Sequence, residues 1–247
     1  MSKYRTIFIS DVHLGTHDSK AKELNAFLKQ NSCDSLIMIG DIIDGWKIQT
    51  NSFKWKESHT TVVKRILNMS KKGTEVIYIA GNHDEFLRPM LSFGFTIGKV
   101  SVKNQHTHIG VDGTRYLVIH GDMFDGITDL APWLAFLGDK LYEIALTINT
   151  QMNHIRHKMG FGYWSLSQYL KERVKSAVGF MFKFEDTISN YAIKRKFDGV
   201  ICGHVHKPEI KNINGIKYLN SGDWVETCSA LVEHHDGTFE IIIWTTE

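Results

Sequence analysis

The chain has 247 residues, of which 43% are hydrophobic, and this is enough to bury the core of one domain. Its formal net charge of +2 is too small to indicate a nucleic-acid-binding surface, and there is no long basic stripe with interleaved aromatic residues. No window approaches the roughly 18 uninterrupted apolar residues of a membrane span. Three cysteines without CxxC spacing argue against a disulfide framework and a thiolate zinc site. We therefore expect a cytoplasmic protein.

Strand-like runs recur along the chain, and a polar cluster follows each one. In chain order they are TIFIS before DVHLG, SLIMI before GDIIDGW, VIYIA before GNHDEF, YLVI before HGD, and GVI before CGHVHKP. Apolar residues at helical spacing predict one helix around residues 24–28 and another over about 55–66, with Gly73 as its stop. Strands that alternate with helices indicate an α/β core.

The later part of the chain has two different patterns. Residues from about 125 to 196 show much helix and little strand, and we predict a helical cap inserted into a single domain that spans residues 1–247. Within it, SLSQYLKERVKSAVGFM has the spacing of an amphipathic helix. Short runs after residue 208, separated by NG and DG turns, predict hairpins that extend a mixed sheet.

The polar clusters at the five strand ends carry ligand-type side chains. Each has a structural explanation when taken alone, because Asp11 could cap a helix, Asp41 could close a turn, and His204 and His206 could be surface residues. Their joint occurrence favours metal binding. Carboxylate, imidazole and amide ligands without sulfur suit Mn²⁺, Fe²⁺, Zn²⁺ or Co²⁺, and we expect Mn²⁺. The strand ends supply seven such ligands, named below, which are too many for one ion. A pair of ions can clamp an in-line displacement at phosphorus.

The motifs DxH, GDxxD, GNHD, HGD and GHxH occur here in this order across nearly the whole chain. The sequence thereby resembles the calcineurin-like metallophosphoesterase family. The resemblance implies a four-layer α/β/β/α sandwich with an inserted helical cap. It also implies two divalent ions and a hydroxide between them as the nucleophile. The ligands it implies are Asp11, His13 and His206 for one ion, Asn82, His120 and His204 for the other, and Asp41 as the bridge between both.

The GNHDEF cluster also supplies candidate catalytic residues. Beside the ligand Asn82, we predict that His83 faces the phosphate as a proton donor or charge stabiliser and that Asp84 orients its imidazole. Asp44 and Asp122 resemble supporting positions in the family, but a carboxylate after a strand may equally cap a turn. We do not predict either as a ligand.

The substrate is predicted to be a small molecule that contains phosphate. A helical cap with aromatic lining and basic edges would suit a lipid-linked phosphate substrate, and it would allow peripheral contact with the inner face of a membrane. Candidate substrate-binding residues are Trp46, Trp164, Lys171 and Arg173. Within the family, the chain is similar to the UDP-2,3-diacylglucosamine hydrolases of lipid A synthesis in its size, in Trp46 after the second motif and in Pro208 after GHVHK.

Two departures from that branch leave other activities open. Its members usually carry Arg where this chain has His83, and their late GAWH element is GDWVE here, around Trp224. An imidazole can protonate an alkoxide leaving group, whereas a guanidinium keeps its protons. The alternatives are therefore a phosphodiesterase or phosphomonoesterase acting on a nucleotide or another small phosphoester. A further alternative is a non-catalytic scaffold with the same fold.

Overall fold

The computed structural model describes residues 3–49, 52–124 and 166–245. The chain falls into two compact units, one of residues 1–124 with 186–247 and one of residues 125–185. None of the described helices combines the length and the apolar character that a membrane crossing requires.

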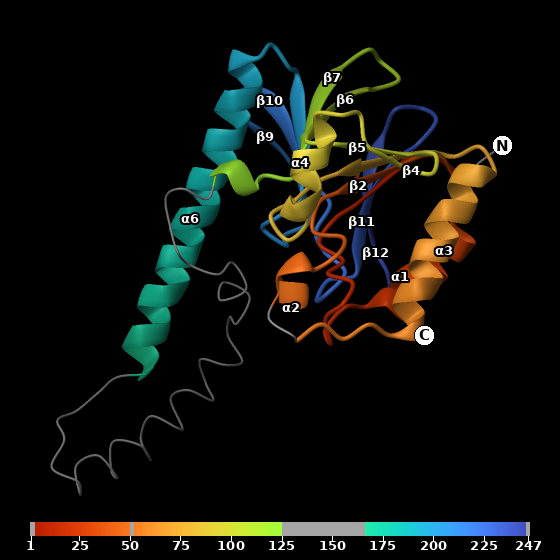
Figure 1. Cartoon of the computed structure of the whole chain (residues 1–247). Helices are drawn as coiled ribbons and strands as arrows, with labels where there is room; N and C mark the ends of the chain where they lie inside the picture. The colour runs from red at the N-terminus through yellow and green to blue at the C-terminus, as the bar shows by residue number, and fades with distance from the viewer. Residues whose placement is uncertain (1–2, 50–51, 125–165, 246–247) are drawn as a thin grey trace, which may run out of the picture. The chain divides into compact units, whose positions relative to one another are not determined.

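A seven-stranded mixed sheet forms one half of the first unit (Figure 1), in the order β12-β11-β1-β2-β3-β5-β4. Its strands are β1 (Tyr4–Ile9), β2 (Cys33–Ile39), β3 (Glu75–Ile79), β4 (Thr96–Ile97), β5 (Val100–Lys103), β11 (Ser229–Glu233) and β12 (Phe239–Ile243). The pairs β1–β2, β2–β3 and β3–β5 are parallel, and β4, β11 and β12 join as antiparallel strands. The carboxyl ends of β1, β2 and β3 therefore lie at one edge of the sheet.

A five-stranded sheet forms the other half, in the order β6-β7-β8-β10-β9. Its strands are β6 (Gln105–Ile109), β7 (Arg115–Ile119), β8 (Gly199–Cys202), β9 (Glu209–Ile213) and β10 (Ile216–Asn220). The three central strands β7, β8 and β10 are parallel to one another. Their carboxyl ends also share one edge.

Helices cover the outer faces of both sheets. The helical segments are α1 (Ala21–Gln30), α2 (Gly45–Gln49), α3 (Glu57–Lys71), η1 (Glu85–Leu87), α4 (Arg88–Leu91), η2 (Asp122–Phe124) and α6 (Leu166–Lys194). Figure 1 shows α1 and α3 together on the seven-stranded sheet. The end of α6 lies at the five-stranded sheet, where Asn214 of the β9–β10 turn donates a hydrogen bond to Asp186 at 3.4 Å.

The central strands bury both of their faces, which explains their unbroken apolar runs. Successive residues alternate between two cores, because side chains of a strand point to opposite faces. In β2, Leu36 and Met38 pack beneath the helices, whereas Ile37 and Ile39 pack against the second sheet. The sequence therefore forms the predicted four-layer α/β/β/α sandwich.

The structure contains all five strands predicted before polar clusters. The hairpins predicted after residue 208 are also present, with the four strands β9, β10, β11 and β12. Strands β4, β5 and β6 were not predicted. The helix predicted in SLSQYLKERVKSAVGFM lies within α6. The cap predicted at about 125–196 stays a prediction, because residues 125–165 lie outside the described part of the chain.

A buried ion cluster joins the two sheets beside the apolar core between them, where Thr6 and Glu233 lie on the same faces of β1 and β11 as Phe8 and Leu231. Glu233 of β11 is fully buried and accepts hydrogen bonds from Arg5 Nη1 and, at 3.1 Å, from Thr6 Oγ1. His108 Nε2, on β6 of the other sheet, lies 2.8 Å from the same carboxylate. Burial alone would raise the pKa of Glu233, but His108 and Arg5 hold it below its ordinary value. The cluster therefore stabilises the folded state when Glu233 is charged.

Glu233→Gln is expected to lower the free energy of unfolding by about 1–3 kcal/mol near neutral pH, because it leaves the partly buried guanidinium of Arg5 without its counter-charge. A carboxyl with a lowered folded-state pKa contributes stability above its unfolded-state pKa, and loses it as pH falls through the folded-state value. The difference between wild type and variant should therefore shrink below the ordinary pKa of 4.5. Urea unfolding as a function of pH measures this difference.

The matched control is Glu240→Gln, since Glu240 is half exposed and pairs with His234 at the surface. This variant should change the unfolding free energy by less than about 1 kcal/mol. A difference for Glu233→Gln that stays constant down to acid pH would contradict the role assigned to the charged cluster.

Candidate metal centre and active site

The predicted ligand residues lie where parallel strands of both sheets end. Asp11 and His13 follow β1, Asp41 follows β2, Asn82 and His83 follow β3, His120 follows β7, and His204 and His206 follow β8. The loops of the two sheets meet here, because His120 Nδ1 lies 2.8 Å from Ile39 O and His204 N donates to Asp11 Oδ2 at 2.9 Å. Ligand sites of open α/β sheets occupy this position.

The backbone is strained at the candidate ligands themselves. Positive φ angles, which side-chain-bearing residues rarely adopt, occur at Asp11 (51°), His13 (49°), Asp41 (54°), His204 (71°) and His206 (54°). Such strain persists only where the surroundings enforce it. The two loops brace each other, since Asp11 N donates to Gly40 O at 3.1 Å and His13 N donates to Asp41 O at 2.9 Å. The strained backbone at these residues indicates that the loops are held in a geometry in which the candidate ligand side chains converge.

At two of the motif positions a carboxylate oxygen lies so close to the backbone that only glycine fits. A Cβ at Gly81 would overlap Oδ1 of Asp41, and one at Gly203 would lie 2.6 Å from Oδ2 of Asp11. The glycines of the GNHD and GHVH motifs therefore make room for the two carboxylates.

The described side chains form three groups in which the possible ligand atoms lie within 4.8 Å of one another: Asp11, His13 and His206; His13, Asp41 and His83; and Asp41, His120 and His204. In the first, His206 Nε2 lies 3.2 Å from Asp11 Oδ1. In the third, His120 Nε2 lies 3.4 Å from Asp41 Oδ2 and 3.2 Å from Asn82 Oδ1. The structure thus brings all seven predicted ligands together, and it places His83 beside them.

Electrostatic pairing compensates for the burial of the two carboxylates. Burial would raise the pKa of Asp11, but the charge of His206 outweighs it and holds the pKa well below the ordinary value. Burial would likewise raise the pKa of Asp41, but the charge of His120 holds it below the ordinary value. Burial would lower the pKa of both histidines, yet the charges of the paired carboxylates raise it to about 10 for His120 and about 9 for His206.

The donor set fits divalent metal ions. Oδ1 of Asp11 is buried, and although His206 is near, no donor is aligned with it for a hydrogen bond. Buried carboxylates of this kind are usually paired or coordinate a metal. Oxygen and imidazole ligands without thiolate suit borderline divalent ions.

Asp44 lies between two histidines of the site. Its Oδ2 is 3.4 Å from Nδ1 of His13 and 3.1 Å from Nδ1 of His83. The two imidazoles meet edge to face with centroids 4.6 Å apart, and Trp46 lies over His83 at 4.0 Å. Burial would lower the pKa of His83, but Asp44 and the charge of Asp41 raise it above the ordinary value.

Asp84 differs from its predicted role. Its carboxylate accepts hydrogen bonds from Tyr78 Oη at 2.6 Å, Ile43 N at 2.9 Å and Ile42 N at 3.1 Å, so it shapes the loop that carries Asp41. The carboxylate beside the His83 ring belongs to Asp44 instead. Burial, followed by the charge of Asp41, raises the pKa of Asp84 to about 6.

Of the candidate substrate-binding residues, the structure describes the side chain of Trp46, which is 42% exposed beside His83 and donates to Glu85 at 3.3 Å. Trp164 and the side chains of Lys171 and Arg173 lie outside the described residues. Asp122, which resembles a supporting position of the family but could equally cap a turn, accepts a hydrogen bond from Arg88 at 2.6 Å.

One supporting residue was missed by sequence reasoning. Asn220 ends β10 and is fully buried. Its side chain donates to Gly203 O at 2.8 Å and accepts from Gly222 N at 2.9 Å, so it holds the loop that carries His204. The signal was available, because NSGDW is a sixth polar cluster after a strand-like run.

Comparison with known proteins identifies the family. The family model described as calcineurin-like phosphoesterase matches residues 4–208. The chain belongs to this family.

Curated relatives of this calcineurin-like phosphoesterase include two named UDP-2,3-diacylglucosamine hydrolase. The protein from Shewanella sp. strain MR-4 is 25% identical over 255 residues, covering 94% of this chain and 95% of its own. The protein from Neisseria gonorrhoeae is 24% identical over 236 residues, covering 88% of each chain. Among solved structures, a dimetal phosphatase from Danio rerio is 13% identical and covers 99% of this chain and 100% of its own, with a TM-score of 0.48. Because the family model matches most of its length, the chain is a phosphoesterase of a family that uses divalent metals.

Metal binding by the metal-free phosphoesterase is expected to release about two protons near neutral pH, because His120 and His206 carry raised pKa values and a ligand imidazole must be neutral. The apparent affinity should consequently rise with pH. Titration calorimetry in two buffers with different ionisation enthalpies measures the number of protons released. His120→Ala should release about one proton fewer, and a binding heat that is independent of the buffer would contradict the pairing.

Proposed function

We propose that the protein is a dinuclear phosphoesterase with Mn²⁺ as the favoured ion. Asp11, His13 and His206 would hold one ion, Asn82, His120 and His204 the other, and Asp41 would bridge the two. Asp41 shares one close group with His13 and another with His120 and His204, so it lies near ligands proposed for each ion, which supports the bridging role. When bound, two such ions supply Lewis acidity that activates water and neutralises charge on the phosphoryl group.

The residues around the metals would handle the leaving group. His83 is suited to donate a proton, because its Nδ1 faces Asp44 at 3.1 Å and its Nε2 lies 3.8 Å from Asp41 Oδ2, on the metal side. Asp44 would act as the positioning residue that holds the His83 ring and also the ring of His13. Asp84 would contribute by shaping the loop of Asp41 rather than by touching the imidazole.

For the substrate, we propose a lipid-linked sugar nucleotide of the UDP-2,3-diacylglucosamine type. The observation that carries this proposal is that relatives named for that substrate align over nearly their whole length. Trp46 supports it, because its exposed indole beside His83 offers a flat surface to a base or a sugar. We also propose that the enzyme acts in the cytoplasm at the inner face of a membrane, which would hold the acyl chains of such a substrate.

A small phosphomonoester or phosphodiester is the second candidate. His83 favours it, because an imidazole paired with Asp44 can protonate an alkoxide, whereas cleavage of a pyrophosphate releases a stable anion that needs no proton.

The deciding experiment measures hydrolysis by the Mn²⁺-loaded protein of UDP-2,3-diacylglucosamine, a nitrophenyl phosphomonoester and a nitrophenyl phosphodiester. We expect the nucleotide lipid to be cleaved with the highest kcat/KM, and His120→Ala to abolish the turnover of all three. Hydrolysis of the nitrophenyl esters alone would assign the protein to the second candidate. Loss of turnover in His120→Ala without loss of metal would contradict the ligand assignment.

His83→Ala is expected to slow the hydrolysis of alkyl phosphoesters by roughly 100-fold or more, because the alkoxide then leaves without a proton. Nitrophenyl esters, whose leaving group is stable without one, should lose less than about tenfold. Steady-state kcat over a series of leaving groups measures the difference. Asp44→Asn should show the same dependence on the leaving group at smaller magnitude.

The matched control is His235→Ala, which removes an imidazole from the β11–β12 turn and should leave kcat unchanged. Equal losses for alkyl and nitrophenyl esters in His83→Ala would rule out proton donation and leave only charge stabilisation.

A further inference from the structure

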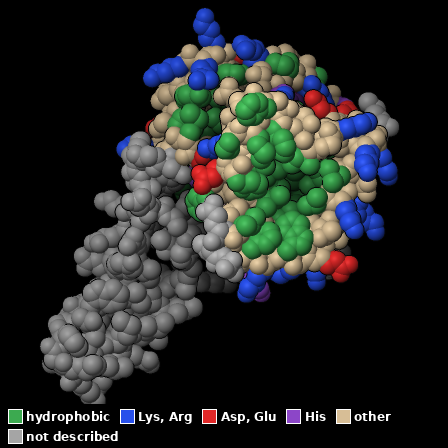
Figure 2. Space-filling model, in the orientation of Figure 1, with side chains coloured by type: hydrophobic (Ala, Val, Ile, Leu, Met, Phe, Trp, Pro, Cys, Tyr) green, Lys and Arg blue, Asp and Glu red, His purple; other side chains and the backbone are tan. Residues whose placement is uncertain are grey.

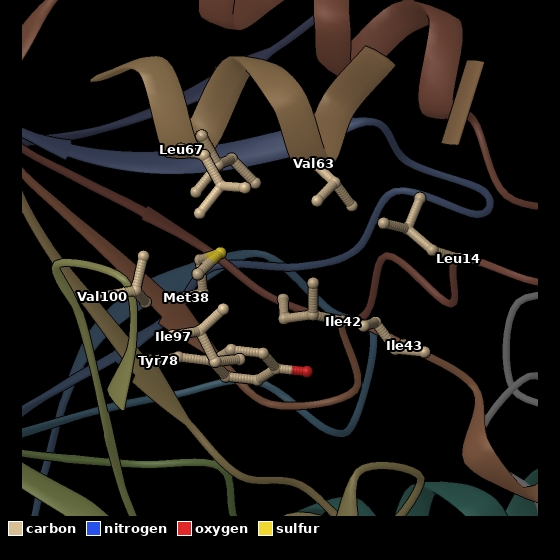
Figure 3. Close-up of a pocket in the computed structure, with 10 residues that line it drawn as sticks. Leu14, Met38, Ile42, Ile43, Val63, Leu67, Tyr78, Ile97 and Val100 are labelled. Carbon is tan, nitrogen blue, oxygen red and sulfur yellow. The ribbon is translucent and has the colours of Figure 1, made fainter. Parts of the chain in front are cut away.

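A hollow with apolar walls lies beside α3 on the outer face of the seven-stranded sheet. Its volume is about 70 Å³. Val63 and Leu67 of α3 form one wall, and Ile97 and Val100 of the β4–β5 hairpin lie opposite them together with Tyr78 (Figure 3). Figure 2 shows hydrophobic side chains gathered around a hollow on one face of the molecule. Ile97 is 37% exposed, so the hollow opens to solvent on the hairpin side.

The hollow follows from the connection between β3 and β5. These strands are parallel neighbours, and such a pair is usually joined by a crossover helix that covers the face of the sheet. Here the connection contains only the three-residue η1, the four-residue α4 and the two-residue β4. The sheet face beside α3 is therefore covered by side chains of a short hairpin instead of a helix.

The walls offer no side-chain hydrogen bond to a ligand. Among the lining side chains, Tyr78 alone carries a hydroxyl, and it donates to Asp84 at 2.6 Å. The other lining residues are Leu, Ile, Val and Met. Apolar walls of this kind favour apolar guests over water, as an enclosed engineered cavity of about 150 Å³ takes benzene or xenon.

We propose that this cavity binds the end of a linear hydrocarbon chain. The volume of this cavity is roughly half that of the engineered cavity that holds benzene. The smaller volume favours the last carbons of a hydrocarbon chain over a ring. The opening at Ile97 allows the rest of the chain to continue into solvent. The site is separate from the metal centre, and its existence does not depend on the substrate proposed above.

The occupant would contact the reverse side of the active-site loops. Ile42 and Ile43 line the cavity, and their backbone amides donate to Asp84 at 3.1 Å and 2.9 Å. They follow directly after Asp41, and Leu14, which also lines the cavity, follows His13. A bound chain would therefore stabilise the loops that carry two candidate ligands.

The probe for this site is 1-octanol, whose neutral head group has little affinity for the metal centre. Methyl NMR of the protein loaded with diamagnetic Zn²⁺ should show saturable shifts at Val63, Leu67 and Val100. Amide hydrogen exchange of Ile42 and Ile43 should slow on binding. Across a series of shorter alkanols, each methylene added should tighten binding by about fourfold until the cavity is full.

Val63→Phe should weaken octanol binding by roughly tenfold or more, because the ring fills the cavity. Lys64→Phe adds the same ring at the exposed neighbouring position and should leave binding unchanged. Leu67→Phe serves as a second filling variant if Val63→Phe does not fold. Absence of methyl shifts up to the solubility limit of octanol, or equal binding by wild type and both filling variants, would overturn the proposal.

Competition then distinguishes the source of the chain. Displacement of octanol by decanoate would indicate a free fatty acid, and displacement by decyl phosphate alone would indicate a phosphorylated lipid. If neither displaces octanol, the assignment to a lipid chain is wrong.

Discussion

Two buried carboxylates in one small site impose the constraint on which the rest of the structure depends. Asp11 is fully buried and Asp41 nearly so, and neither can remain charged there without cationic partners. Imidazoles supply those partners, with His206 beside Asp11 and His120 beside Asp41. These histidines follow strands of the five-stranded sheet, whereas the carboxylates follow strands of the seven-stranded sheet. The site therefore requires both sheets to be packed together.

That dependence explains why the sequence predicted so much of the site. Polar clusters follow strands whose apolar runs are easily recognised, and parallel strands place their carboxyl ends at one edge. The ligand residues could consequently be grouped without coordinates. The contacts of each carboxylate could not be predicted from the sequence, because they depend on the path of the loop that carries it. Asp84 is adjacent to His83 in sequence, yet its oxygens accept from Ile42, Ile43 and Tyr78, and Asp44 faces the imidazole.

The strands that the sequence did not predict lack strong apolar signals. QHTHI forms β6 at the edge of its sheet, where His108 is the one buried residue of the strand and polar residues are tolerated. Residues 96–103 form β4 and β5, of which β4 has only two residues. This weakly patterned stretch replaces a crossover helix, and it creates the cavity beside α3. Residues 96–103, which the sequence pattern predicts poorly, thus form a cavity that no sequence motif indicates.

Asp44 connects the metal side of the site with the side that handles protons. It contacts Nδ1 of both His13 and His83, so the Nε2 atoms of the two rings point toward the carboxylate of Asp41, at 3.9 Å and 3.8 Å. A guanidinium in place of His83 would satisfy Asp44 by charge and hydrogen bonds, but it would keep its protons and could not transfer one to a leaving group. An imidazole keeps that ability only if its orientation is fixed. The pairing of Asp44 with His83 is therefore what makes this site suited to leaving groups that need a proton.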